Sequence, residues 1–181
     1  MTDDDLAWET LSGETDYVCP GFDIRREQVR LPDGTETDFH YLSEEDTVVV
    51  LPFTPDGSVV VIEEWRQAVR RVNRGLPAGG VEDAEDREAA ARRELAEETG
   101  YEAGEVGHLA TVEPANGVAD IAFHYFVARD CEPTAEQDLD FNESIRVDIT
   151  DFEDLLAAAR EGTLRDGRTA LAVLQYALRE Q

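Results

Sequence analysis

Residues 79–101 read GGVEDAEDREAAARRELAEETGY. The two glycines predict a tight turn, and the acid-rich, proline-free segment after them predicts a helix from about Asp86 to Thr99. Acids in the first turn of that segment favour the positive end of a helix. Gly100 suits the C-terminus of this helix, because glycine readily adopts the left-handed conformation that is common there.

Three glutamates give the predicted helix a dense acidic face. Glu94, Glu97 and Glu98 stand at i, i+3 and i+4, so their carboxylates project to one side. Like charges at this spacing destabilise a helix, and a divalent cation would relieve the repulsion. Carboxylates are hard oxygen ligands that suit Mg²⁺ or Mn²⁺ better than zinc. The alternative interpretation is a solvated charged surface, which is the usual outcome for an arbitrary acidic helix.

The fixed residues of this stretch resemble the Nudix box. The box pattern is Gly, five residues, Glu, seven residues, Arg-Glu, an apolar residue, any residue, Glu-Glu, any residue, Gly and an apolar residue. Every position is filled here, by Gly79, Glu85, Arg93, Glu94, Leu95, Glu97, Glu98, Gly100 and Tyr101. Only Tyr101 is less usual, because aliphatic residues are commoner at that position. The resemblance implies a hydrolase that cleaves a diphosphate bond in a nucleoside diphosphate linked to another group.

The resemblance also implies which residues bind the metal. Glu94 and Glu98, one turn apart, are expected to be direct ligands. Glu97, on the adjoining edge of the helix, is expected to bind a second metal or a metal-bound water, and so to take part in catalysis. In the box pattern a backbone carbonyl of the glycine turn reaches the metal as well. Here that carbonyl belongs to Ala78 or to Gly79.

Other box residues are expected to be structural. By resemblance, Arg93 pairs with Glu85 and holds the glycine turn against the helix, while Gly79 and Gly100 permit the backbone to bend. The remaining acids of the stretch match no fixed position and are interpreted as surface acids: Glu82, Asp83, Asp86 and Glu88.

Several segments outside the box resemble the ADP-ribose pyrophosphatase branch of the family. They are Trp8–Leu11 with the strands near residues 22–42, Glu64–Gln67, Leu76–Gly79, Asn142–Val147 and Glu161–Leu164. Two departures leave room for another nucleoside diphosphate sugar. Gly75 stands where that branch usually has a glutamate, and residues 113–120 lack its adjacent Pro-Gly.

Residues outside the box are candidates for binding and proton transfer. Arg66 is the expected diphosphate-binding cation, because its guanidinium fork matches phosphate oxygens. Trp8 has two alternative roles. It either stacks on a nucleobase, in the same subunit or across a dimer interface, or it is a buried core residue. Glu143 is the leading candidate for the general base, with Asp120 and Asp140 as alternatives. An exposed loop acid is the competing interpretation of Glu143.

The charge of the chain is strongly negative. Its 42 acidic residues face 16 basic ones, a net charge of −26, and every basic residue is an arginine. We interpret this as adaptation to a salty cytoplasm, as in halophilic archaea; the alternative is an acidic protein of an ordinary cell. Binding to nucleic acid or to anionic membranes is disfavoured, because both require a basic patch.

Length and composition favour one domain with a small appendage. Residues 1–45 are expected to form an N-terminal strand extension that acts as a dimerisation element, and residues 46–181 the Nudix domain. The chain has no apolar run long enough to span a membrane, and its acidic start does not resemble a secretion signal, so we expect a cytoplasmic protein. The resemblance to the ADP-ribose pyrophosphatase branch, which often exchanges its N-terminal strands, implies a homodimer. Cys19 and Cys131 are expected to be reduced thiols. The three histidines lie apart and are expected to be packing or surface residues: His40, His108 and His124.

The pattern along the chain predicts an α+β or α/β fold, which agrees with the α/β/α sandwich with a mixed sheet that the resemblance implies. Residues 1–14 are expected to be partly disordered. Strands are predicted at 22–30, 35–42, 47–53, 58–65, 105–112, 121–128 and 144–149. The run Val48–Leu51 suits a strand buried on both faces. Helices are predicted at 151–161 and 166–179, with Leu155, Leu156, Leu171, Leu174 and Leu178 facing the core.

Two rival functions remain open. One is the same chemistry on another nucleotide, such as an oxidised nucleoside triphosphate. The other is a nucleotide-sensing module that keeps the fold without turnover; the intact set of box acids and the lack of room for a DNA-binding segment speak against it.

Overall fold

The computed structural model describes residues 5–180. The chain divides into two compact units. One unit contains the described residues up to Glu45 together with residues 113–122, and the other contains residues 46–112 and the described residues from Phe123 onward.

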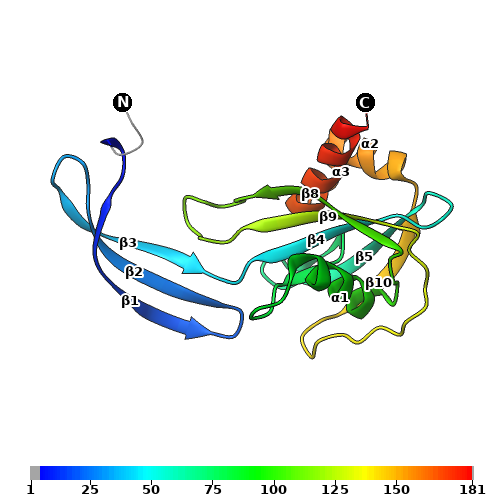
Figure 1. Ribbon diagram of the computed structural model, residues 1–181, viewed down its shortest axis with the longest axis horizontal. Coiled ribbons are helices and arrows are strands. Elements are labelled where there is room, and N and C mark those ends of the chain that lie inside the picture. Colours follow the sequence, from blue (N-terminus) through cyan, green and yellow to red (C-terminus); the bar gives the residue numbers. More distant parts are fainter. Residues whose placement is uncertain (1–4, 181) are drawn as a thin grey trace. The chain divides into compact units, whose positions relative to one another are not determined.

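The larger unit contains two sheets (Figure 1). The first has the order β7-β4-β9-β8, with β4 and β9 parallel and the other pairs antiparallel. Its strands are β7 (Ala78–Gly80), β4 (Thr47–Pro52), β9 (Phe123–Arg129) and β8 (Glu105–Val112). The second sheet is antiparallel, with the order β10-β5-β6. Its strands are β10 (Ile145–Thr150), β5 (Val59–Arg66) and β6 (Arg71–Gly75).

Helices cover both faces of the sheets. The helices are α1 (Arg87–Thr99), α2 (Phe152–Glu161) and α3 (Gly167–Arg179). Every residue of β4 is buried, as the apolar run predicts. Val48 and Val50 pack with residues of α1, whereas Val49 and Leu51 pack with residues of α2 and α3. This alternation places β4 at the centre of an α/β/α sandwich and confirms the predicted fold class.

The smaller unit contains one antiparallel sheet of order β1-β2-β3. Its strands are β1 (Glu9–Cys19), β2 (Phe22–Arg30) and β3 (Glu36–Ser43). The expectation of disorder is therefore wrong for residues 9–14, because β1 begins at Glu9 and pairs along β2. Residues 1–4 lie outside the described part of the chain. Within the described residues of this unit, Val29 and Ile121 are the buried apolar side chains.

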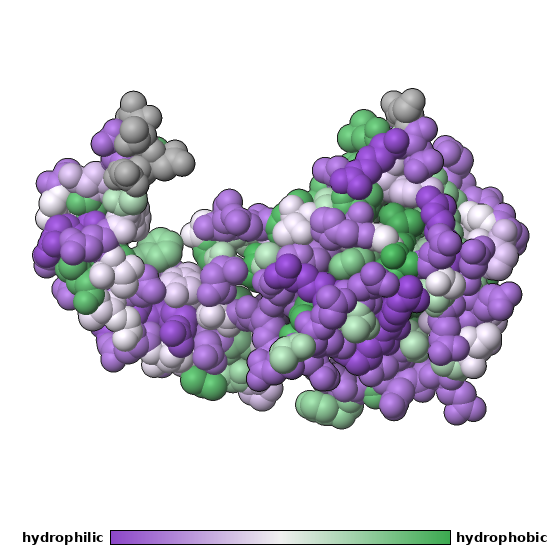
Figure 2. All heavy atoms as spheres, in the orientation of Figure 1, coloured by the Kyte–Doolittle hydropathy of each residue, from purple (hydrophilic) through white to green (hydrophobic). Residues whose placement is uncertain are grey.

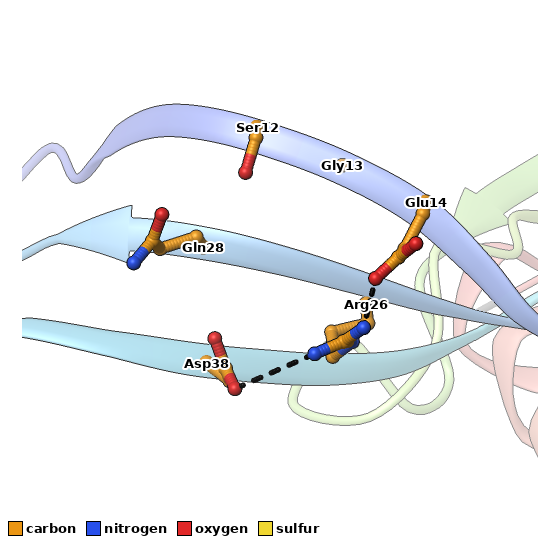
Figure 3. A pocket seen from close by; sticks show the side chains of 6 residues that line it. All are labelled: Ser12, Gly13, Glu14, Arg26, Gln28 and Asp38. Carbon is orange, nitrogen blue, oxygen red and sulfur yellow. Dashed lines mark hydrogen bonds and ion pairs between the residues drawn. The ribbon is translucent and has the colours of Figure 1, made fainter.

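Ion pairs link the three strands of the smaller unit. Figure 3 shows Arg26 of β2 between Glu14 of β1 and Asp38 of β3, with which it forms ion pairs. Its Nε also donates to Asp16 at 3.1 Å. Such cross-strand pairs of opposite charge stabilise a sheet that buries little apolar surface.

The predicted helices and most predicted strands agree with the structure to within a few residues. The sequence interpretation missed three strands: β1, β6 in an arginine-rich segment, and the three-residue β7. Leu178 was expected to face the core and is instead 69% exposed. In the larger unit, Figure 2 shows hydrophilic residues over much of the visible surface. The longest helices within residues 5–180 have 13 residues, and none of them is a candidate to cross a membrane.

Candidate active site

Helix α1, which carries the box acids, has defined ends. Asp86 precedes it in an extended conformation, and its Oδ1 accepts hydrogen bonds from the N–H groups of Glu88 and Ala89. Asp86 is therefore the N-cap of α1 and has a structural role beyond that of a surface acid. The rule that helices begin after Asp, Asn, Ser or Thr would have identified it.

The C-terminal end of α1 contacts a long loop, residues 131–144. Gly100 has φ of 73°, and a Cβ there would lie 2.8 Å from the carbonyl oxygen of Ala135. The loop donates three hydrogen bonds to the last carbonyls of the helix: Ala135 N–H to Gly100, Asp138 N–H to Glu97, and Gln137 Nε2 to Glu98. Because these carbonyls have no partner inside the helix, the loop satisfies them and is held along the C-terminal turn.

The loop and the acidic face of α1 enclose a hollow of about 200 Å³. Its lining combines three predicted metal ligands with the predicted base Glu143 and its alternative Asp140, with Glu82, which was interpreted as a surface acid, and with Asp138, which the sequence interpretation did not single out. The lining residues are Glu82, Arg93, Glu94, Glu97, Glu98, Asp138, Leu139, Asp140 and Glu143. Glu143 and Asp140 also bond to each other, since Glu143 Oε2 accepts from Asp140 N–H at 2.9 Å and Asp140 O accepts from Glu143 N–H at 3.0 Å.

Two of the box glutamates are buried. Glu98 is 2% exposed and Glu94 8% exposed. Burial, with added repulsion from neighbouring carboxylates, raises the pKa of Glu98 to about 8 and the pKa of Glu94 to about 6. Oε2 of Glu98 accepts the N–H of Ala78 at 2.9 Å, which joins the helix to β7. The Glu97 side chain is 40% exposed at the mouth of the hollow.

Arg93 organises the acids around the glycine turn. Its Nη1 donates to Glu94 at 2.7 Å and to Glu97 at 2.9 Å. Nε and Nη2 donate to the two oxygens of Glu85, and Nη2 also reaches the carbonyl of Gly80 at 2.8 Å. These hydrogen bonds lower the pKa of Glu85. A single guanidinium therefore joins the helix, the turn after β7 and the loop before α1.

The acids of the hollow have the chemistry that a hard divalent cation needs. Within residues 5–180, no three Asp, Glu, His or Cys side chains form a preassembled metal cage. Glu94 and Glu97 are held by Arg93, so they would have to turn from this guanidinium toward an incoming cation. The buried, mutually repelling carboxylates nevertheless fit Mg²⁺ or Mn²⁺, because a cation would offset both the burial and the repulsion.

Arg66, the predicted diphosphate-binding cation, ends β5. Its Nη2 lies 2.7 Å from Oε2 of Glu64, a carboxylate whose residue is only 8% exposed. Burial raises the pKa of Glu64, and the charge of Arg66 opposes this effect. Within the described residues, the lining of the hollow does not include Arg66. A Cβ at Gly75 would meet Asp166 Oδ2 at 3.3 Å, so the start of α3 occupies that side of the chain.

Two further predicted site residues belong to the smaller unit. Trp8 is 48% exposed and packs edge-on against Phe39, with ring centroids 5.7 Å apart. Asp120 is exposed; its N–H donates to the carbonyl of Leu42, and its Oδ2 accepts from the hydroxyl of Ser43 at 2.9 Å. Trp8 and Asp120 thus both contact residues of the smaller unit.

Known proteins resemble both the sequence and the fold. Residues 44–170 match the NUDIX domain. The ADP-ribose pyrophosphatase of Bacillus subtilis (strain 168) is 30% identical over 176 residues, which span 97% of this chain and 95% of that protein. A GDP-mannose pyrophosphatase of Klebsiella pneumoniae subsp. pneumoniae is 32% identical over 126 residues, 66% of this chain and 63% of the relative.

The fold has a counterpart among solved structures. The crystal structure of an ADP compounds hydrolase superposes with a TM-score of 0.82 at 19% identity, covering 96% of this chain and 92% of the other. The domain match covers most of the chain, and its boundaries enclose the acidic hollow. The chain therefore belongs to the Nudix family, as the pattern of residues 79–101 predicts.

Proposed function

We propose that this Nudix hydrolase cleaves the diphosphate of ADP-ribose or of a related nucleoside diphosphate sugar in a reaction that depends on Mg²⁺ or Mn²⁺. Water adds across the phosphoanhydride bond and yields a nucleoside monophosphate and a sugar phosphate; from ADP-ribose these are AMP and ribose 5-phosphate. One observation carries the proposal: the loop that contains Glu143 is bonded to the end of α1, so that its acids line one hollow with the box glutamates.

The charge of this hollow supports a requirement for a divalent cation. A diphosphate is itself negative and would be repelled by the carboxylates that line the cavity. Glu94 and Glu98 would hold the cation, together with a backbone carbonyl of Ala78 or Gly79, and Glu97 would hold a second cation or its water. Bound metal would neutralise the phosphate oxygens and acidify a water.

Glu143 is our proposed general base, the group that takes the proton from the attacking water. Its position in the lining of the hollow supports this role, as does the hydrogen bond from Asp140 N–H, which orients one carboxylate oxygen. Asp140 lines the same hollow and remains an alternative, whereas Glu97 sits on the helix edge, partly exposed. Asp120 is a weaker choice, because its carboxylate already accepts from Ser43 in the smaller unit.

Arg66 and Trp8 are our proposed substrate-binding residues. Arg66 would offset phosphate charge, and to do so it would exchange its present partner, Glu64, for the ligand. Trp8 would stack on the nucleobase through the part of its ring that is exposed. Glu85, Arg93, Gly79 and Gly100 would support the site without contacting the substrate.

We further propose a cytoplasmic homodimer in which residues 1–45 form the contact. The sheet of the smaller unit leaves large apolar side chains exposed, among them Tyr17 at 58% and Val18 at 69%. A second copy that covers this surface would bury them. Light scattering of the full chain, compared with a variant carrying Tyr17→Ser and Val18→Ser, tests this proposal through the measured mass.

A substrate panel tests the proposed reaction. The panel contains ADP-ribose, GDP-mannose, other nucleoside diphosphate sugars and nucleoside triphosphates, each incubated with and without Mg²⁺ or Mn²⁺. We expect metal-dependent release of a nucleoside monophosphate from one or more diphosphate sugars. GDP-mannose is included because one relative is a GDP-mannose pyrophosphatase. Hydrolysis of triphosphates alone, or ligand binding without turnover, would contradict the proposal.

A further inference from the structure

A line of hydrogen-bonded polar side chains crosses the first sheet of the larger unit, away from the residues assigned above. At its centre is His124 of β9, which is 3% exposed. Its Nε2 lies 2.9 Å from Oδ2 of Asp46, and its Nδ1 lies 3.0 Å from the hydroxyl of Thr111. That hydroxyl is in turn 2.9 Å from Nε2 of His108 on β8.

The partners of His124 determine its tautomer. A carboxylate can only accept, so His124 Nε2 carries the proton and donates to Asp46. Nδ1 of His124 and Nε2 of His108 each share a hydrogen bond with the hydroxyl of Thr111, which can both donate and accept. Both ring nitrogens of His124 therefore have a hydrogen-bond partner, so the ring can be buried without an unsatisfied polar atom.

Asp46 connects this line to the box. Its backbone oxygen accepts the N–H of Val81 at 2.9 Å, directly after β7. Its Oδ2 accepts from Nη2 of Arg87 at 3.0 Å, and Arg87 is the first residue of α1. Asp46 therefore contacts both ends of the short loop that joins the glycine turn to the helix with the acidic face.

The line also joins three strand ends. Asp46 is the first residue of the larger unit, Thr111 lies at the end of β8, and His124 lies at the start of β9. At these points the chain passes between its two units. Figure 1 shows β4, β9 and β8 side by side at this place in the sheet.

We propose that His124 is a positioning residue for the box. Through Asp46 it fixes where the loop of residues 81–86 begins and ends, and so the distance between the glycine turn and Glu94 and Glu98 on α1. Apolar packing alone would not require a histidine, because Phe126, two residues further along the same face of β9, packs toward α1 without such bonds. The catalytic part of this proposal rests on the proposed metal-dependent hydrolysis.

Two substitutions separate the hydrogen bond from the volume of the side chain. His124→Phe keeps a ring but removes the donor to Asp46 and the acceptor for Thr111. His124→Gln keeps an N–H that can donate to Asp46. Val173→Ala is the control for lost stability, because Val173 is fully buried on α3, in the cluster on the other side of the sheet.

The first measurement is the Mg²⁺ concentration that gives half-maximal hydrolysis of the substrate found in the panel. We expect His124→Phe to raise it at least about tenfold, the size of effect known for residues that orient metal ligands. In His124→Gln the half-maximal Mg²⁺ concentration should return to within about threefold of the wild-type value. Val173→Ala should lower the melting temperature but leave this Mg²⁺ concentration unchanged. Equal metal dependence in the wild type and His124→Phe would overturn the proposal.

The second measurement needs no turnover. Amide hydrogen exchange is followed by NMR in the metal-free protein, at Val81 and in the first turn of α1. In His124→Phe, but not in Val173→Ala, exchange at Val81 should accelerate relative to the strand centre at Val49. Unchanged exchange at Val81 would refute the positioning role. If the wild type hydrolyses no nucleotide, the proposed function fails, while the exchange data still decide the role of His124.

Discussion

A Cβ on Gly79 would lie 2.2 Å from the Cδ of Glu94. The backbone of β7 thus rests directly on the carboxylate of a proposed metal ligand, and the absence of a side chain at position 79 makes this contact possible. Displacing Glu94 from this position would cost it its burial and the hydrogen bond that it receives from Arg93.

The first prediction concerns Gly79→Ala. The added methyl group must push either β7 or the Glu94 carboxylate aside, so the turn carbonyls and the carboxylate would no longer be placed to share the proposed cation. We expect kcat/KM to fall about 100-fold, as for other changes that misplace metal ligands, with little change in circular dichroism. The matched control is Gly107→Ala on β8, where a Cβ would meet nothing within 4 Å. Equal activity in both variants would show that the close contact has no functional importance.

The second prediction concerns Glu98→Gln. An amide keeps the shape of the side chain but offers a divalent cation no negative charge, so turnover should fall at least about 100-fold. The melting temperature of the metal-free protein should not fall, because the amide oxygen can still accept from Ala78 N–H, and a carboxyl whose pKa is raised to about 8 is already mostly uncharged at neutral pH. Glu88→Gln is the control, since Glu88 is exposed on the same helix. Wild-type turnover in Glu98→Gln would exclude this residue from the mechanism.

The box could be predicted from the sequence because its signals are local. The extent of α1, the common direction of Glu94, Glu97 and Glu98, and the cap at Gly100 all depend on residues within a few positions of one another. The doubly buried β4 was predictable for the same reason, since four consecutive apolar residues leave no polar face.

Other parts of the site depend on long-range contacts that no local pattern encodes. The loop of residues 131–144 lies along α1 because Gln137 and Asp138 donate to the carbonyls of Glu98 and Glu97, about forty residues earlier in the chain. Strand β1 reads as a polar segment, because cross-strand ion pairs such as that of Arg26 with Asp16 replace apolar burial. The match of residues 64–67 to a family motif predicted a binding role for Arg66. It did not predict that Arg66 pairs with Glu64, because that contact depends on side-chain geometry at the end of β5.

The third prediction concerns Arg93→Lys. An ammonium group cannot bridge Glu85, Glu94 and the carbonyl of Gly80 as the guanidinium does, so several charge-assisted hydrogen bonds are lost at a side chain that is only 24% exposed. We expect the free energy of unfolding, measured in urea, to fall by about 2 kcal/mol. The adjacent Arg92→Lys is the control, because Arg92 bonds to Glu88, which is exposed, and to the carbonyl of Ala103, and an ammonium group can keep one of these contacts, so stability should change by less than about 1 kcal/mol. Equal losses would argue against a special role for Arg93.

The fourth prediction concerns the two thiols. Cys131 is 1% exposed, and burial raises its pKa to about 12. It should therefore resist a thiol reagent at pH 8, whereas Cys19, at intermediate exposure, reacts. An unfolded thiol ionises near pH 8.5, so from there to about pH 12 the folded chain retains a proton that the unfolded chain loses. Stability should fall as pH rises through this window, and the slope should be smaller in Cys131→Ala. Two rapidly reacting thiols in the native protein would contradict this assignment.

The fifth prediction concerns salt. With 42 acidic residues against 16 basic ones and a net charge of −26, the folded chain repels itself, and unfolding lets the acids move apart. Raising KCl from about 0.05 M to about 1 M shortens the Debye length to about 3 Å and screens this repulsion. We expect the melting temperature to rise over this range, by more than in a variant in which five exposed acids are changed to Asn or Gln. KCl is preferred to sulfate, because sulfate stabilises most proteins through exclusion from their surface. A melting temperature that falls toward molar KCl would contradict adaptation to a salty cytoplasm.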